Sequence, residues 1–440
     1  MQAPLPPVPV PPPRPLPLWQ ALRVARSNTL AVIPQGAFVE PVFAQRSPLG
    51  PSFLVSAAEG VKHVLLDAAD NYPKAAIQSR LFEAFLGEGV LTSEGEVWRR
   101  HRRLMAPAFD PHSVQAAVPT ITATAREVIG TWRPGQVMDV SEAMGDLTLK
   151  IIARAMFSAA GDDLGPVMER TSRSAEAVLE RFGLADFTPG LRGLRARDRE
   201  RRIAALFTVF DAWIARLIAE RRVAPGDGDL LDRLIAARDP ETGRGLSDRE
   251  VRDQFVTIFI AGHETTAVAL TWTWYLLALH QQVEARLHAA LDASPDAPPP
   301  YARQVVEEAM RLFPPVPRIP LRQARAEDEI CGVRIPKGAL VCVAPWVVHR
   351  HRDHWDDPER FDPDRFAGER PARYAYLPFG AGPRVCIGAS LAMTEAVEVL
   401  CEIARRYRLK LLDPGEVGMK PRMTLRPVGR IGMELVAREP

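Results

Sequence analysis

The sequence predicts a mainly α-helical protein with small β-sheets, and three observations lead to that fold class. Residues 110–245 carry apolar side chains mostly at helical spacing. A second pattern runs from Ser247 to about His280 with little to interrupt a helix. Two short β-branched runs, Ile330–Ile335 and Ala339–Val343, flank Pro-Lys-Gly and predict a hairpin. With 440 residues, 47% of them apolar, the chain can bury a sizeable core.

Composition excludes several classes of protein. Lysine and arginine total 56 against 54 acidic residues, so the net charge of +2 gives no case for a nucleic-acid binder. None of the four cysteines forms a CxxC pair, so neither a zinc site nor a disulfide framework is predicted. A reducing, cytoplasmic setting is therefore expected.

The N-terminal end is rich in proline. Residues 1–17 contain nine prolines and no continuous apolar run, so no signal peptide or transmembrane anchor is expected there. We predict a mobile arm over residues 1–18 and one domain over residues 19–440.

Short elements follow the arm and helices occupy the middle of the chain. Ala37–Phe43 and Ser52–Val55 are strand-like, and Glu59–Leu66 is helical by spacing. Further amphipathic helices are predicted at Ala125–Trp132, Met144–Phe157, Ser174–Phe182 and Ile203–Ala224.

The central helix begins with a capping-box pattern, Ser247-Asp-Arg-Glu250. It would extend roughly 50 Å. A membrane span is disfavoured because His263 and Glu264 lie in its middle. A zinc-protease HExxH motif is excluded because Ala267 stands four residues after His263. The remaining interpretation is a buried helix in which a hydroxyl side chain beside a glycine locally opens the backbone hydrogen bonds.

One cysteine occupies a glycine-rich turn. The segment Phe379–Gly388 reads Phe-Gly-Ala-Gly-Pro-Arg-Val-Cys-Ile-Gly, and a helical pattern begins near Ile387. Free N–H groups at that helix start would point toward the sulfur of Cys386 and stabilise its thiolate, as a nucleophile or as a metal ligand. The alternative is a buried structural thiol.

The ten-residue segment resembles the haem-binding signature of the cytochrome P450 family, Phe-Gly-x-Gly-x-Arg-x-Cys-x-Gly, at all six specified positions. Ala261-Gly-His-Glu-Thr-Thr266 is likewise similar to the family's oxygen-activation motif. The resemblance implies the P450 fold, with haem b between the central helix and the helix after the cysteine. It implies Cys386 as the axial iron ligand and Glu264 and Thr265 as catalytic residues that deliver protons. Because no CxxCH occurs, no thioether to the haem is expected.

The resemblance also implies further haem contacts. Trp98 and Arg102, four residues apart and so on one helical face, match residues that bind a haem propionate. The alternative is a solvated basic face with one anchoring tryptophan. The remaining cofactor-binding positions implied by the family are Ala261, Arg322, Phe379, Arg384 and Gly388.

Two groups of residues complete the implied site. Glu308 and Arg311 match the family's Glu-x-x-Arg, which an arginine from a later loop completes as a structural cluster. Arg365 is assigned that role, with Arg360 as the second choice. Val316, Pro317 and Ile319 are expected to border the substrate pocket.

The implied activity is a monooxygenase that uses O2 to hydroxylate a C–H bond of a lipophilic molecule such as a terpenoid, fatty acid or aromatic hydrocarbon. Because the chain has no Rossmann or flavin fingerprint, electrons are expected from a ferredoxin-type partner with its reductase. Arginines proposed to dock that partner are Arg99, Arg100, Arg103 and Arg405. The alternatives are a haem-thiolate sensor or carrier, a peroxide-driven peroxygenase, and a purely structural helical protein.

Overall fold

The computed structural model describes residues 8–47, 50–76, 83, 86–157, 208, 210–226, 228–413 and 417–438. The predicted helix at 174–182 lies outside these residues, as do 203–207 and 209 of the helix predicted at 203–224; residues 210–223 are helical. The chain divides into two compact units. The first comprises Met1–Ala75, Ala125–Leu147 and Thr265–Pro440, and the second comprises Ala76–Thr124 and Thr148–Glu264.

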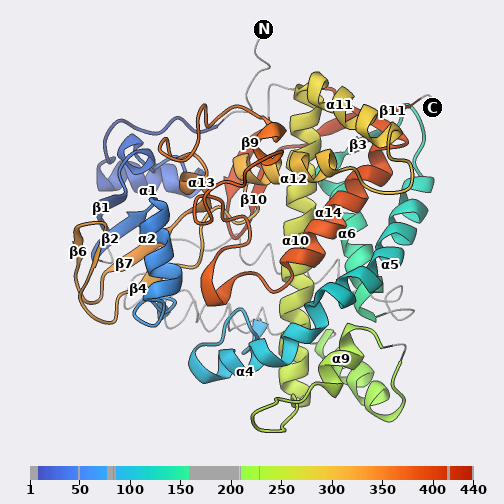
Figure 1. The fold of residues 1–440 in the computed structure, drawn as a ribbon, viewed down its shortest axis with the longest axis horizontal. Helices are drawn as coiled ribbons and strands as arrows, with labels where there is room; N and C mark the ends of the chain where they lie inside the picture. Colours follow the sequence, from blue (N-terminus) through green and yellow to red (C-terminus); the bar gives the residue numbers. More distant parts are fainter. Residues whose placement is uncertain are drawn as a thin grey trace. The chain divides into compact units, whose positions relative to one another are not determined.

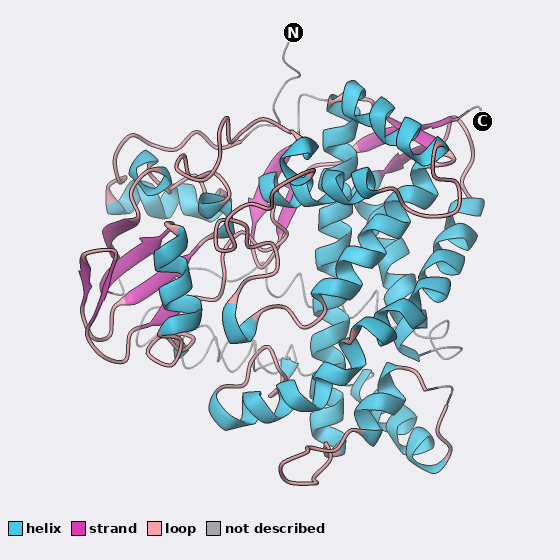
Figure 2. Cartoon of the chain, in the orientation of Figure 1, coloured by secondary structure: helices cyan, strands magenta, loops and turns pink. Residues whose placement is uncertain are grey.

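Helices dominate the described residues, as the sequence predicts (Figures 1 and 2). The α-helices are α1 (Leu18–Ser27), α2 (Ala58–Lys62), α4 (Gly95–Met105), α5 (Pro111–Gly130), α6 (Val140–Phe157), α9 (Leu230–Ala236), α10 (Asp248–Leu279), α11 (Gln281–Asp292), α12 (Pro300–Leu312), α13 (Pro345–Val348) and α14 (Ala389–Ala404). Short 3-10 or π turns are η1 (Gln35–Phe38), η2 (His63–Asp67), η3 (Ala106–Phe109), η6 (Pro363–Phe366) and η7 (Gly382–Arg384).

The strands of the described residues form small sheets within the first unit. Their bounds are β1 (Val42–Ser47), β2 (Gly50–Val55), β3 (Val137–Asp139), β4 (Arg322–Gln323), β5 (Asp328–Ile330), β6 (Val333–Ile335), β7 (Leu340–Val343), β8 (Tyr407–Leu411), β9 (Gly418–Pro421), β10 (Leu425–Val428) and β11 (Gly432–Ala437). The largest sheet has the order β1-β2-β7-β4, and a second has the order β3-β11-β8. β9 pairs with β10 and β5 with β6.

Two strand predictions are wrong. The expected strand at Ala37–Phe43 begins only at Val42, because Gln35–Phe38 forms the turn η1. The expected hairpin between Ile330–Ile335 and Ala339–Val343 does not form. Cys331 (φ 49°) and Gly332 (φ 76°) make a tight turn of two positive-φ residues, so the first run folds back on itself as β5 and β6.

The second run of that expected hairpin becomes β7, which pairs in parallel with β2 and antiparallel with β4. Leu340, Val341 and Val343 are buried there. A strand gains more from a place inside a sheet than from an edge of a two-stranded ribbon, because neighbouring strands on both edges satisfy its backbone hydrogen bonds.

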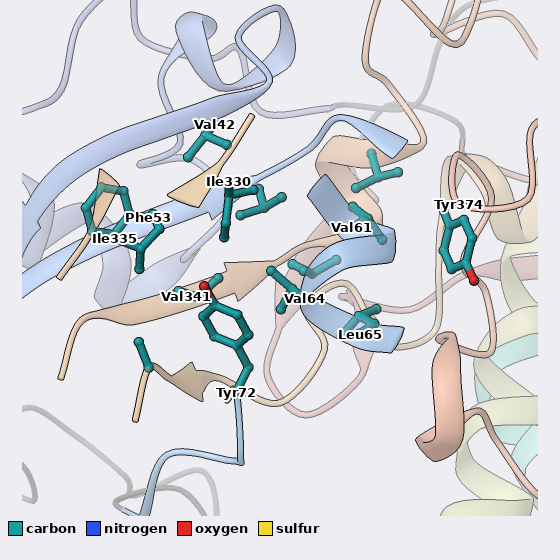
Figure 3. Packing of buried hydrophobic residues seen from close by; sticks show 14 of the residues in the cluster. Val42, Phe53, Val61, Val64, Leu65, Tyr72, Ile330, Ile335, Val341 and Tyr374 are labelled. Atoms are coloured by element: carbon teal, nitrogen blue, oxygen red, sulfur yellow. The ribbon is translucent and has the colours of Figure 1, made fainter. Parts of the chain in front are cut away.

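A hydrophobic cluster joins this sheet to α2 and η2 in the first unit (Figure 3). Val61 and Val64 from the helical segment meet Val341 from the sheet. Gly60 permits the approach, since a Cβ at that position would lie 2.8 Å from a methyl of Val55. The predicted helix at Glu59–Leu66 is therefore confirmed by α2 and η2. Its packing holds η2 in place, and η2 in turn contacts the loop that contains Cys386.

α10 begins as the sequence predicts. The Ser247 N–H donates to Glu250 Oε2 at 2.8 Å, and the Glu250 N–H donates to Ser247 Oγ at 3.3 Å, which completes the capping box. Although burial opposes the charged form, hydrogen bonds from Ser247, Arg100 and His101 lower the pKa of Glu250 to about 2. No described helix, α10 included, combines the length and the apolar character needed to cross a bilayer.

Candidate functional site

Cys386 lies at the end of a tight loop in the first unit. Its N–H donates to the Phe379 carbonyl at 2.9 Å, which closes the loop, and η7 forms the turn in between. α14 begins three residues later at Ala389, with Gly388 as its N-cap. The first N–H groups of a helix carry a partial positive charge, which favours a thiolate near that end. Cys386 is exposed, whereas Cys401, which lies within α14, is buried.

Gly382 determines how closely this loop approaches η2. Its φ is +71°, and a Cβ there would overlap the backbone carbonyl of Leu65. A side chain is therefore excluded by backbone contact as well as by conformation. Gly380 also has φ +71°, but its nearest neighbour is a methyl of Ile319 at 3.9 Å. Gly382 thus fixes the loop against η2, and Gly380 supplies only the turn.

His349 connects the start of the cysteine loop to α12. Its Nε2 accepts the Leu377 N–H at 2.7 Å, so its Nδ1 carries the hydrogen and donates to the Arg311 carbonyl at 3.1 Å. Burial, together with the nearby Arg311 guanidinium, lowers the pKa of His349 to about 3. The imidazole is therefore neutral. Sequence reasoning missed His349. The one indication in the sequence is that His349 directly follows the apolar segment Pro345–Val348.

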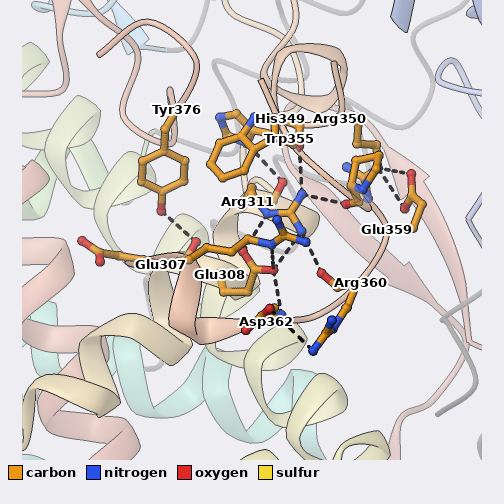
Figure 4. Close-up of polar contacts among 12 residues, drawn as sticks. Glu307, Glu308, Arg311, His349, Arg350, Trp355, Glu359, Arg360, Asp362 and Tyr376 are labelled. Carbon is orange, nitrogen blue, oxygen red and sulfur yellow. Dashed lines mark hydrogen bonds and ion pairs between the residues drawn. The ribbon is translucent and has the colours of Figure 1, made fainter. Parts of the chain in front are cut away.

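The Arg311 guanidinium is completely buried and all five of its N–H groups are used (Figure 4). Two bind Glu308, at 2.6 and 2.8 Å. The other three donate to the carbonyls of His349, Pro358 and Arg360. Burial raises the pKa of Glu308, and the two bonds from Arg311 oppose that shift. Arg311 thereby joins α12 to the single loop between α13 and η6, which contains all three of these carbonyls.

The later loop contributes Arg365 to this cluster. The Arg365 Nε lies 3.5 Å from Glu308 Oε1, and the Asp362 N–H donates to the same oxygen at 2.9 Å. The side chain of Arg360 is instead 65% exposed and approaches Asp362 at 3.7 Å. The structure therefore brings Glu308, Arg311 and Arg365 together. Arg365 is the first choice made from the sequence; Arg360, the second choice, contributes its backbone carbonyl.

The middle of α10 has one uncovered face. Between Asp253 and Leu277 the helix is buried except at residues 260–262, 264 and 265. Ala261, Glu264 and Thr265 are spaced i, i+3 and i+4 and so share that face. α10 stays helical here, and the local opening of its hydrogen bonds suggested by the sequence remains a prediction.

The opposite side of this segment is packed against α6 within the second unit. The Thr148 hydroxyl donates to the His263 carbonyl at 3.1 Å. A Cβ on Gly262 would lie 3.1 Å from a methyl of Ile152. His263 is buried, its ring close to Phe259 and its Nδ1 2.8 Å from the carbonyl of that residue. His263 thus serves packing, which leaves Glu264 and Thr265 at the uncovered face.

Trp98 and Arg102 lie on α4 in the second unit, both half-buried and on one face as predicted. Their propionate role stays a prediction. The neighbouring arginines, which are expected to dock a redox partner, have ion-pair partners within this chain. Arg100 pairs with Glu250, and Arg103 pairs with the buried Asp239.

In the first unit Arg405 is likewise engaged, since it donates to the carbonyls of Leu291, Ser294 and Ala297. Arg99 remains exposed and pairs with its helix neighbour Glu96. Three of the four arginines proposed for docking are thus held by groups of the same chain.

The other predicted contacts lie in the first unit. Arg322 is buried on β4 and donates to the Tyr72 carbonyl at 3.5 Å, while Arg384 is half-buried in η7. Of the predicted pocket residues, Ile319 lies against Gly380, near the cysteine loop. Val316 is half-buried, and Pro317 is buried and accepts the Trp346 N–H.

The comparisons with known proteins agree with this geometry. The family model of cytochrome P450 matches residues 10–432. A cyclooctat-9-en-7-ol 5-monooxygenase of Streptomyces melanosporofaciens is 35% identical over 82% of this chain and 81% of its own length. A pentalenene oxygenase of Streptomyces avermitilis is 32% identical over 80% of this chain and 81% of its own length. The crystal structure of a cytochrome P450DA mutant haem domain is similar over 98% of both chains, with 27% identity and a TM-score of 0.83.

The chain therefore belongs to the cytochrome P450 family. It has the P450 fold, and the family makes it an oxygen-incorporating oxidoreductase with a haem-thiolate cofactor.

The residues present fit a haem. An exposed thiol stands beside a helix start, and a face of α10 that carries small and polar side chains is left uncovered. Among the described residues no group of three or more His, Cys, Asp or Glu could hold a metal ion.

Proposed function

We propose that the chain is a haem b monooxygenase that uses O2 to hydroxylate a C–H bond of a small lipophilic molecule, with Cys386 as the iron ligand. The observation that carries this proposal is the loop around Cys386. Gly382 allows the loop to pack directly against η2, and His349 links the start of the loop to α12 by hydrogen bonds. The thiol of Cys386 is exposed close to the start of α14. A loop held this firmly keeps one sulfur in one position, as a ligand of the haem iron would require.

When bound, a thiolate-ligated haem supplies oxygen activation, because electron donation from sulfur favours cleavage of the O–O bond. The contribution proposed for the chain is proton delivery. Glu264 and Thr265 share the uncovered face of α10, and the hydroxyl and carboxyl there can bind water and pass protons. Ala261, one turn earlier on the same face, leaves room for a flat ring system because its side chain is a single methyl group.

The remaining haem contacts are proposed from the family pattern. Trp98 and Arg102 would bind a haem propionate, and Arg322 and Arg384 would be further propionate-binding arginines. Phe379 and Gly388 would border the ring at the cysteine loop. Glu308, Arg311 and Arg365 hold that loop and take no part in the chemistry.

We infer a terpenoid as the substrate. The two Streptomyces relatives are named for cyclooctat-9-en-7-ol and pentalenene. In this chain Ile319 lies beside Gly380, and Val316 is half-buried directly after the pair Pro314-Pro315. Apolar side chains of this kind suit a ligand that is itself mostly hydrocarbon.

The electron source is proposed to be a ferredoxin-type protein with its reductase, in the cytoplasm. Of the four arginines Arg99 is the exposed one, so it remains proposed for docking. Arg100, Arg103 and Arg405 are half-buried and bond other groups of the chain.

The iron ligand is tested by the absorption of the reduced, carbon-monoxide-treated protein. Wild type should give the red-shifted band of thiolate ligation, and Cys386→Ala should lose it. Cys342→Ala is the matched control and should keep it. An intact band in Cys386→Ala, or a colourless wild-type protein, would refute the proposal.

Proton delivery is tested by the coupling of electron use to product. Thr265→Val keeps the shape but removes the hydroxyl, so electrons should be consumed with less product. Thr265→Ser restores a hydroxyl and should restore coupling. Equal coupling in all three proteins would instead favour a peroxide-driven enzyme or a haem-thiolate sensor.

A further inference from the structure

The N-terminal segment that leads into α1 has a charge pattern found nowhere else in the chain at this length. From Met1 to Val39 it contains Arg14, Arg23 and Arg26 and no aspartate or glutamate. All three arginines are exposed, and in the described part of the chain none of them forms an ion pair. The segment thus presents uncompensated positive charge in a chain whose overall charge is nearly balanced.

Large apolar side chains are exposed in the same segment. Trp19 is 64% exposed, Leu18 57% and Val10 84%. Trp19, Arg23 and Arg26 are spaced i, i+4 and i+7, so they share one face of α1. Ala21, Leu22 and Val24 are only partly exposed. The outer face of α1 therefore combines an aromatic ring with two guanidinium groups.

The segment is held in place on both sides of α1. Before the helix, the Gln35 N–H donates to the Pro12 carbonyl at 2.9 Å. After it, Asn28 donates to the Met419 carbonyl at 3.4 Å, and the Arg318 guanidinium bonds the Thr29 carbonyl. These bonds belong to the first unit. The exposed face is thus presented in one orientation, which lowers the entropy lost when it binds a partner.

We propose that this face, made of Leu18, Trp19, Arg23 and Arg26 together with Val10 and Arg14, docks the protein on a lipid bilayer that contains anionic headgroups. Tryptophan is favoured at the level of the headgroups, where its ring is partly apolar and its N–H stays hydrated. Arginine bonds lipid phosphates and is attracted by the negative surface potential. The attachment is peripheral, because α1 has only 10 residues and lies along the surface. It does not depend on the proposed substrate.

Vesicle binding tests the proposal with the complete haem-loaded protein. Co-sedimentation is measured with phosphatidylcholine vesicles, with and without phosphatidylglycerol, at low and high salt. Binding should require the anionic lipid and weaken with salt. The triple variant Arg14→Gln, Arg23→Gln and Arg26→Gln should bind about 100-fold more weakly, at about fivefold for each arginine. Leu18→Ser with Trp19→Ser should reduce binding at least about tenfold.

Matched controls lie elsewhere on the first unit. Arg430→Gln removes an exposed arginine and Val428→Ser an exposed apolar side chain, and both should bind vesicles like wild type. Quenching by brominated lipids reports insertion of Trp19 through the difference between wild type and Trp19→Phe.

Failure to bind anionic vesicles at low salt would overturn the proposal. Binding that is unchanged in the triple variant or in the Leu18 and Trp19 variant would also overturn it, since another surface would then be responsible. Binding of an acidic ferredoxin that depends on these residues, without vesicle binding, would assign the face to a protein partner instead.

Discussion

The Nε2 atom of His349 accepts the backbone N–H of Leu377 at 2.7 Å, nine residues before Cys386. The Nδ1 atom of the same ring donates to the Arg311 carbonyl. The two hydrogen bonds of one neutral imidazole therefore link α12 to the start of the cysteine loop. Protonation would replace the acceptor at Nε2 with a second donor that faces an N–H group.

The first prediction is a loss of stability in acid that depends on His349. Its pKa is about 3 when folded and near 6.5 in the unfolded chain, so between these values the unfolded chain binds more protons. This contribution to stability is complete above pH 6.5 and declines as the pH falls. At pH 5 the loss should be about 2 kcal/mol, measured by urea denaturation at a series of pH values.

His349→Gln removes the titrating group. The variant should be less stable than wild type at pH 7 by about 1–3 kcal/mol, because its hydrogen bonds are imperfect. Its stability should also fall less between pH 6.5 and 5. Replacement of the exposed His112 by glutamine is the control and should keep the wild-type pH dependence. Parallel curves for wild type and His349→Gln would contradict the assignment.

The second prediction compares two glycines with the same φ. Gly382→Ala should cost more than about 3 kcal/mol or prevent folding, because the new Cβ overlaps the Leu65 carbonyl. Gly380→Ala should cost only about 1–2 kcal/mol, the strain of a positive φ with room for the methyl group. Denaturant midpoints measure both. Equal losses of stability in the two variants would mean that the positive φ, and not the contact with η2, sets the cost of a side chain at Gly382.

The third prediction separates the two arginines of the later loop. Arg365→Met should destabilise the protein by about 1–2 kcal/mol, since it removes an ion pair with the buried Glu308 and a bond to the Asp357 carbonyl. Arg360→Met should change stability by less than about 0.5 kcal/mol, because that side chain is exposed. A larger loss in Arg360→Met would reverse the assignment.

The fourth prediction concerns Glu395 on α14, which is 3% exposed and has a buried carboxyl oxygen with no hydrogen-bond partner in the described structure. Burial raises its pKa from 4.5 to about 8. The neutral form therefore contributes stability that is complete below pH 4.5 and is lost as the pH rises toward 8.

Glu395→Gln cannot ionise, so it should match wild type near pH 4 and exceed it by up to about 3 kcal/mol at pH 7. Thermal unfolding at both pH values measures the difference. A difference that stays constant with pH would show that the carboxyl does not titrate as its burial implies. Glu398→Gln, on the same helix, is the control.

Much of the fold was predictable because its signals are local. The reciprocal bonds of Ser247 and Glu250 follow from their spacing, and the end of α10 at Leu279 follows from the length of the apolar pattern. The turn at Cys331 and Gly332 is also local, but the sequence pattern favours Pro-Lys-Gly as the turn, which predicts the hairpin one strand too late.

The partners of buried polar groups were much harder to predict. Arg100 and Arg103 look like surface charges in a basic run, yet Glu250 and Asp239 lie more than 130 residues away along the chain. His349 carries no motif, and its importance arises only when Leu377 and Arg311 are brought to its two ring nitrogens.

By itself the sequence determined the family, the cysteine in a glycine turn ahead of a helix, and the polar segment of a capped central helix, since each depends on neighbouring residues only. Tertiary structure alone decided that β7 joins β2 and β4, that Arg365 reaches Glu308, and that Gly382 meets Leu65. These contacts join segments far apart in the chain. Their free energy comes from burial and hydrogen bonding between distant groups, which local spacing does not encode.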